Sequence, residues 1–210
     1  MRVAILSDIH SNLNAFQAVL RHIESKGSPD KLWCLGDIVG YGPDPHACIE
    51  LVQQYSNICV AGNHDLAAVG GISTADFNEA AARANQWTAQ QLTEDDHEYL
   101  QFLPLTLSDG PFTLVHGSPR EPVWEYLFTP HAALENFPVF TTPYCLVGHT
   151  HVPVIFQYDN DSVSMLEFPE NDILHLADTR LIINPGGVGQ PRDHDPRASY
   201  AIYELSLIHI

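Results

Sequence analysis

Five short apolar runs, spread over the first three quarters of the chain, each end in aspartate, asparagine or histidine. Each run with the residues that follow it reads VAIL–SDIH, LWCL–GD, ICV–AGNHD, FTLV–HGS and YCLV–GHTH. Their length and their β-branched or aromatic content favour strands, and continuous apolar character is typical of strands buried on both faces. A polar strand end that meets water would explain any one case. Five in succession indicate one shared site.

Helical patterns lie between the early runs, and further strand-like runs follow later. The helix signals are apolar stripes over 13–23, 48–55 and 77–87, and capping residues at Thr93 with Asp96 and at Thr129 with Pro130. The later strand-like runs are 153–156, 181–184 and 200–205. Strand and helix therefore alternate first and strands dominate later, which predicts an α/β sandwich with a partly antiparallel second sheet. With no linker or repeat, we expect a single domain over residues 1–210.

The charge balance limits the partners of the chain. Lys and Arg number 9 against 26 Asp and Glu, which gives a formal net charge of −17. Such a surface repels nucleic-acid phosphates and anionic lipids, so we expect neither a nucleic-acid duplex nor a membrane as partner. The four cysteines show no C-x-x-C spacing, which predicts buried, reduced thiols. Without a signal-peptide pattern or a membrane span, a cytoplasmic location is expected.

The side chains at the strand ends indicate transition metals. In open α/β sheets, ligands gather at the carboxyl ends of strands. The candidate ligands are Asp8, His10, Asp37, Asn63, His116, His149 and His151. Mixed oxygen and nitrogen donors without a thiolate suit Mn, Fe, Ni, Co or Zn, and are too rich in nitrogen for a Ca or Mg site. Seven donors exceed the needs of one ion beside solvent, so two ions that share a carboxylate are predicted.

The same motifs, taken in order, resemble a known family. Asp-x-His, Gly-Asp, Gly-Asn-His-Asp, His-Gly and Gly-His-Thr-His follow one another between residues 8 and 151. This order resembles the calcineurin-like metallophosphoesterases, and the later NPGGVGQPRD stretch resembles their small bacterial and archaeal phosphodiesterase branch. The resemblance implies a four-layer αββα sandwich with two mixed β-sheets and a dinuclear site at the strand ends.

The resemblance also divides the ligands between two divalent ions, for which manganese is the first choice. Asp8, His10 and His151 would bind one ion. Asn63, His116 and His149 would bind the other, and Asp37 would bridge the two. His64 would donate a proton to the leaving oxygen or steady charge on the phosphoryl group. Asp65 would orient His64, or would only cap a turn.

The activity implied by the resemblance is phosphodiester hydrolysis of a small phosphorylated substrate, with a metal-bridging hydroxide as nucleophile. Two alternatives within this class stay open: hydrolysis of a dinucleoside polyphosphate, and phosphomonoester hydrolysis. A more distant alternative is a non-catalytic scaffold of the same fold that binds proteins. Such a scaffold lacks the histidine after asparagine, which this chain keeps as His64. A homo-oligomer is also left open.

Few residues are available to bind phosphate. Some relatives with phosphatase activity carry an Asp-Arg pair soon after Gly-Asp, whereas residues 36–45 here read GDIVGYGPDP, which disfavours phosphoprotein phosphatase activity. Arg120 and Arg192 are the candidate substrate-binding residues, because one guanidinium group can donate hydrogen bonds to two phosphate oxygens at once. A structural ion pair is the alternative for each. Trp124 and Tyr126 could stack on a base or simply pack.

Overall fold

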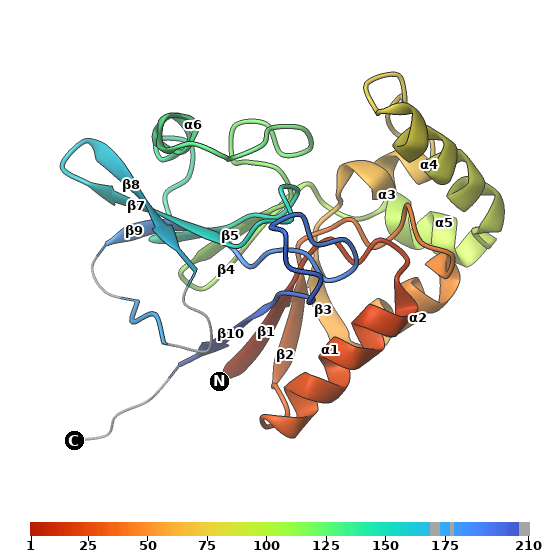
Figure 1. Ribbon diagram of the computed structural model, residues 1–210, viewed down its shortest axis with the longest axis horizontal. Helices are drawn as coiled ribbons and strands as arrows, with labels where there is room; N and C mark the ends of the chain where they lie inside the picture. Colours follow the sequence, from red (N-terminus) through yellow and green to blue (C-terminus); the bar gives the residue numbers. More distant parts are fainter. Residues whose placement is uncertain (169–172, 177–178, 206–210) are drawn as a thin grey trace.

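Two mixed β-sheets lie face to face at the centre of the molecule, and helices cover the outer face of each (Figure 1). This computed structural model describes residues 1–168, 173–176 and 179–205. In Figure 1, α1 and α2 lie on the opposite side of the sheets from α6. The predicted four-layer αββα sandwich with two mixed sheets is therefore confirmed.

The first sheet has the strand order β10-β1-β2-β3. Its strands are β1 (Arg2–Leu6), β2 (Lys31–Cys34), β3 (Ser56–Cys59) and β10 (Ala201–Glu204). The first three are parallel, while β10 runs antiparallel to β1. The crossover helices are α1 (Leu13–Ser25) and α2 (Pro45–Tyr55). Parallel pairing places the carboxyl ends of β1, β2 and β3 at one edge.

The second sheet has the strand order β4-β5-β6-β9-β7-β8. Its strands are β4 (Thr106–Asp109), β5 (Phe112–Val115), β6 (Tyr144–Leu146), β7 (Val154–Asp159), β8 (Ser162–Glu167) and β9 (Arg180–Asn184). β5, β6 and β9 are parallel, and the other neighbouring pairs are antiparallel. The remaining helices are α3 (Asn63–Ala68), α4 (Glu79–Gln91), α5 (Glu94–Gln101) and α6 (Pro130–Asn136).

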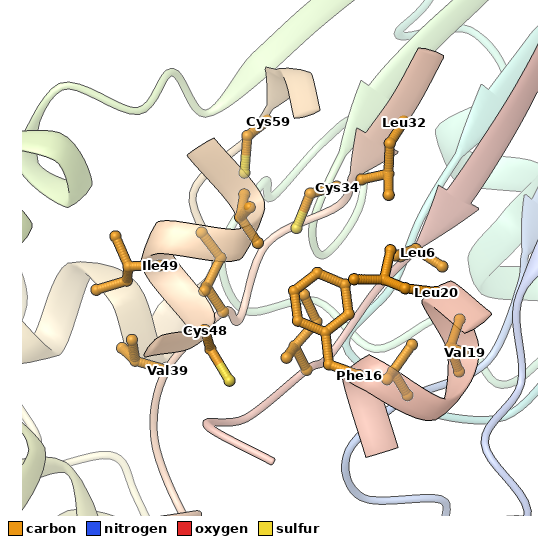
Figure 2. Close-up of a cluster of buried hydrophobic side chains, with 14 of the residues drawn as sticks. Leu6, Phe16, Val19, Leu20, Leu32, Cys34, Val39, Cys48, Ile49 and Cys59 are labelled. Carbon is orange, nitrogen blue, oxygen red and sulfur yellow. The ribbon is translucent and has the colours of Figure 1, made fainter. Parts of the chain in front are cut away.

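Side-chain alternation along the strands creates three separate core layers. On β1, Ala4 and Leu6 face the helices, whereas Val3 and Ile5 face the second sheet. Figure 2 shows the helix-facing layer, in which Phe16 of α1 packs near Leu6. A third layer lies between the second sheet and α6. Strands buried on both faces explain why the apolar runs in the sequence are continuous rather than alternating.

Most predicted elements are confirmed, and the differences concern three short elements and one helix start. The sequence did not predict β4, β8 or the short α3. The third predicted helix, which is α4, begins at Glu79 rather than at residue 77. The Asn78 side chain accepts a hydrogen bond from the Ala81 amide at 2.9 Å and so caps this helix. Phe77 therefore lies outside the helix.

The predictions for the cysteines and for membrane segments can also be compared with the fold. Cys34, Cys48, Cys59 and Cys145 are all free and buried, as predicted. Across the described residues, the helices are too short or too polar to span a bilayer.

The layer between the sheets makes a testable contribution to stability. Trp33 is 1% exposed, and its ring meets that of Phe112 edge to face at 5.4 Å. We expect Trp33→Ala to lower the free energy of unfolding by roughly 3–5 kcal/mol, because it leaves a cavity between two sheets. Trp87→Ala, on a side chain that is 40% exposed, is the matched control and should cost less than about 1 kcal/mol. Urea denaturation of both variants measures the difference; equal losses would contradict it.

Candidate functional site

All seven predicted ligands come together where the carboxyl ends of the two sheets meet. They lie on the segments that follow β1, β2, β3, β5 and β6, and every one is buried. Within these segments, three groups of side chains could each hold a metal ion: Asp8, His10 and His151; His10, Asp37 and His64; and Asp37, His116 and His149. The structure thus brings together residues that are up to 143 positions apart in the sequence, Asp8 and His151 (151 − 8 = 143).

The first group contains two imidazoles whose nitrogens face each other. The Nε2 atoms of His10 and His151 lie 3.2 Å apart, and His151 Nε2 lies 3.2 Å from Asp8 Oδ1. The other nitrogen of each ring is held by the backbone. His10 Nδ1 donates to the Val39 carbonyl at 3.0 Å, and His151 Nδ1 donates to the Gln190 carbonyl at 2.5 Å. In the neutral rings, the Nε2 lone pairs therefore point at one another.

A similar arrangement occurs around His116, which belongs to the third of these groups. His116 Nδ1 donates to the Leu35 carbonyl at 2.8 Å, which leaves its Nε2 as an acceptor. That Nε2 lies 3.2 Å from Asn63 Oδ1 and 3.2 Å from His149 Nδ1. In a neutral His116 ring this lone pair could not hydrogen-bond to the amide oxygen, so the geometry calls for a proton or a metal ion between them.

Asp37 lies between His10 of the first group and His116 of the third. Its Oδ2 is 3.6 Å from His10 Nε2 and 3.4 Å from His116 Nε2. Its Oδ1 accepts a hydrogen bond from the His64 amide at 2.8 Å, which fixes the carboxylate. Gly62 allows this approach, since a Cβ there would lie 2.0 Å from Asp37 Oδ1. One carboxylate therefore reaches both groups.

The electrostatics of the site favour added positive charge. Burial lowers the pKa of His10 and of His149 to about 3, so these rings are neutral and their lone pairs are free. Burial also lowers the pKa of His116, but the charges of Asp37 and Asp8 outweigh it and raise that pKa to about 10. Without a metal, His116 thus takes up a proton to balance the two carboxylates.

The donor set fits a transition-metal centre. Within the described part of the chain, Asp8 Oδ1 and His149 Nε2 are buried without a hydrogen-bond partner. Burial of unpaired polar atoms is costly, and a cation satisfies carboxylate oxygens and imidazole lone pairs together. Oxygen and nitrogen donors without a nearby thiolate suit the metals expected from the sequence.

An unusual backbone conformation supports these side chains. Left-handed φ values between 49° and 65° occur at Asp8, His10, Asp37, His149 and His151. Residues other than glycine rarely adopt this region, which costs about 1–2 kcal/mol each. The turns after the strands therefore hold their ligands in place at an energetic cost.

His64 lies beside the histidine groups, while Asp65 serves the backbone. The His64 ring lies 4.8 Å from that of His10, and burial lowers its pKa. Its Nδ1 has no hydrogen-bond partner among the described residues, and a Cβ at Gly40 would lie 2.3 Å from it. Asp65 instead accepts hydrogen bonds from the Gly62 amide at 3.0 Å and the Val39 amide at 3.1 Å. The expected orientation of His64 by Asp65 is not supported by this geometry.

The two candidate arginines have different surroundings. Arg192 lines the cavity next to the histidine groups, and its Nη2 donates to Gln190 Oε1 at 2.7 Å. The Arg120 guanidinium instead pairs with Glu125 and with Glu135, and it is absent from the cavity lining. These contacts are those of the structural ion pair that the sequence left open as the alternative for Arg120.

A cavity of about 360 Å³ opens above the histidine groups. Besides the predicted residues, its lining includes Tyr41, Asp76, Phe77, Asn78 and Gln190, together with Trp124 and Tyr126. The apolar stripe over 77–87 predicted that Phe77 lies in a helix. The asparagine at position 78, a good N-cap, was the signal that Phe77 lies outside it. Tyr41 and Gln190 had no comparable signal.

Comparison with known proteins gives matches along nearly the whole chain. A sequence model of the calcineurin-like phosphoesterase superfamily domain matches residues 1–207. An uncharacterized protein of Methanocaldococcus jannaschii is 38% identical over 208 residues, covering 96% of this chain and 82% of that protein. The crystal structure of a metallophosphoesterase from Sphaerobacter thermophilus is 50% identical, with a TM-score of 0.87, and covers 97% of this chain and 83% of that one.

A more distant match has a named activity. The symmetrical bis(5'-nucleosyl)-tetraphosphatase of Vibrio cholerae is 30% identical over 144 residues, covering 66% of this chain. The match spans about half of that enzyme, 52% of its length. The buried histidine groups, the two mixed sheets and the match along nearly the whole sequence agree with one another, and the chain belongs to the calcineurin-like phosphoesterase superfamily.

Proposed function

We propose that the protein is a metal-dependent phosphodiesterase. The observation that carries the proposal is the position of Asp37, whose single carboxylate lies between two groups of buried histidines at the base of a cavity. The ligand sets would be Asp8, His10 and His151 for one ion and Asn63, His116 and His149 for the other, bridged by Asp37. Two divalent ions, manganese by preference, would polarise the phosphoryl oxygens and acidify a water for attack at phosphorus.

The residues of the chain would orient the substrate and handle the leaving group. Arg192 lines the cavity and can donate to a phosphoryl oxygen. His64 lines it as well, and its lowered pKa keeps the ring neutral, so one N–H remains to donate to the departing oxygen. Asp65 supports this position indirectly, because it accepts hydrogen bonds from the Gly62 amide at the start of α3 and from the Val39 amide in the segment after β2.

Hydrolysis of a dinucleoside polyphosphate is the second candidate. It is favoured by the tetraphosphatases among the relatives, of which this chain matches about half. It is disfavoured by charge, because among the described residues Arg192 is the one lysine or arginine that lines the cavity. A phosphomonoesterase, a scaffold role, a cytoplasmic location and a homo-oligomer stay predictions.

Metal content tests the site itself. After dialysis against manganese, we expect about two ions per chain by elemental analysis. Asp37→Asn should weaken binding by at least about tenfold, because it removes the shared negative charge. Asp76→Asn, in the cavity lining but outside the histidine groups, should keep both ions. Full metal content in Asp37→Asn would remove the bridging role.

Turnover tests the reaction. The manganese-loaded protein should hydrolyse bis-p-nitrophenyl phosphate faster than p-nitrophenyl phosphate. His64→Ala should keep its metal and lose roughly 10²–10⁴-fold in kcat, which is the usual contribution of a general acid. His131→Ala is the matched control, since that side chain is 82% exposed on α6. Loaded protein that turns over neither ester would favour the scaffold.

A further inference from the structure

Aromatic rings form one wall of the cavity, beside the residues proposed for the reaction. Phe77 and Trp124 both line it, and their rings meet edge to face at 5.2 Å. Phe77 also meets the His64 ring at 4.8 Å, so the wall continues directly into the proposed leaving-group residue. Both rings are only partly buried. An apolar wall of this kind has no group that binds a phosphoryl oxygen, but it offers a surface on which a flat ring can stack.

Tyr126, in contrast, packs against a proposed metal ligand. Its ring stacks on that of His149 at 3.9 Å with an angle of 18°, and Phe128 lies nearly parallel to it at 5.5 Å. Tyr126 thus covers and positions a proposed metal ligand. Tyr41 also lines the cavity, but its ring packs against those of His10 at 4.9 Å and His64 at 4.7 Å. We therefore assign the ligand ring to Phe77 and Trp124, which lie next to each other.

Polar groups next to the aromatic wall suit a nucleoside. Asp76 and Asn78 flank Phe77 in the sequence, line the cavity and are exposed. Asn78 Oδ1 is occupied by the Ala81 amide, which leaves its NH₂ group to donate, while the Asp76 carboxylate accepts. A donor and an acceptor beside a flat apolar wall match the edge of a base or a pair of ribose hydroxyls.

The charges of the cavity limit how many phosphates it can take. Its lining contains Arg192 as the cation, against the carboxylates of Asp37 and Asp76. Two divalent ions would offset the site carboxylates, but Asp76 would still repel a chain of several phosphates. A phosphodiester carries a single negative charge and fits this balance.

We propose that the cavity takes a nucleoside phosphodiester, with the base against Phe77 and Trp124 and the phosphate at the histidine groups beside Arg192. The volume of about 360 Å³ lies in the range of small-ligand sites. This inference rests on the proposed function, because it assumes that the phosphate lies at Asp37.

Calorimetry with product-like ligands tests the base site without turnover. AMP and ribose 5-phosphate carry the same phosphate and differ by the base. On manganese-loaded protein, we expect AMP to bind at least about tenfold more tightly, the usual effect of stacking one base on an aromatic ring. Trp124→Leu and Phe77→Leu should bring the two affinities within about threefold while ribose 5-phosphate binding stays unchanged. Trp87→Ala, on the exposed face of α4, should keep the difference.

The outcomes separate this inference from the proposed function. Equal affinity for both ligands in the wild type, or an unchanged preference in both leucine variants, overturns the base site even if diesters are hydrolysed. A base preference without any hydrolysis supports the site and counts against the phosphodiesterase. Comparison of ApA with Ap4A as substrates tests the charge argument: faster cleavage of ApA supports it, and faster cleavage of Ap4A overturns it.

Discussion

The site depends on nitrogen lone pairs that are turned toward one another. Each of His10, His116 and His151 donates its Nδ1–H to a backbone carbonyl, so each Nε2 is an acceptor whenever its ring is neutral. Facing acceptors repel each other in a buried space. The surrounding fold supplies the rigidity that holds them there, and a positive charge between them turns the repulsion into binding. Burial keeps the His10 and His149 rings neutral, and Asp37 lies within 3.6 Å of His10 and 3.4 Å of His116.

The two-sheet architecture explains how one such centre can draw on so much of the chain. β1, β2 and β3 end at one edge of the first sheet, and β5 and β6 end at the matching edge of the second. Packing the sheets face to face through a layer that includes Trp33 and Phe112 brings these edges together. The helices on the outer faces bury the remaining strand surfaces, and the ends of the strands stay available for chemistry.

The sequence was most informative where residue type and strand position agree. The ligand types at five strand ends predicted the convergence, and caps such as Thr93 marked helix starts that the structure confirms. β4 and β8 were missed because their mixed, exposed side chains give no continuous apolar run. The roles of Arg120 and Asp65 depend on partners that are not predictable from spacing, Glu125 for the first and backbone amides for the second. Cavity walls such as Tyr41 depend on how separate loops meet, which no local pattern encodes.

The left-handed turns at Asp8, His10, Asp37, His149 and His151 have a consequence for how such a chain can change over time. Each of these side chains is tolerated at an energetic cost that glycine would avoid. Exchange of such a side chain for glycine would relieve the backbone but remove a metal-binding group, so the relaxed turn and the binding group make opposite demands on the same position.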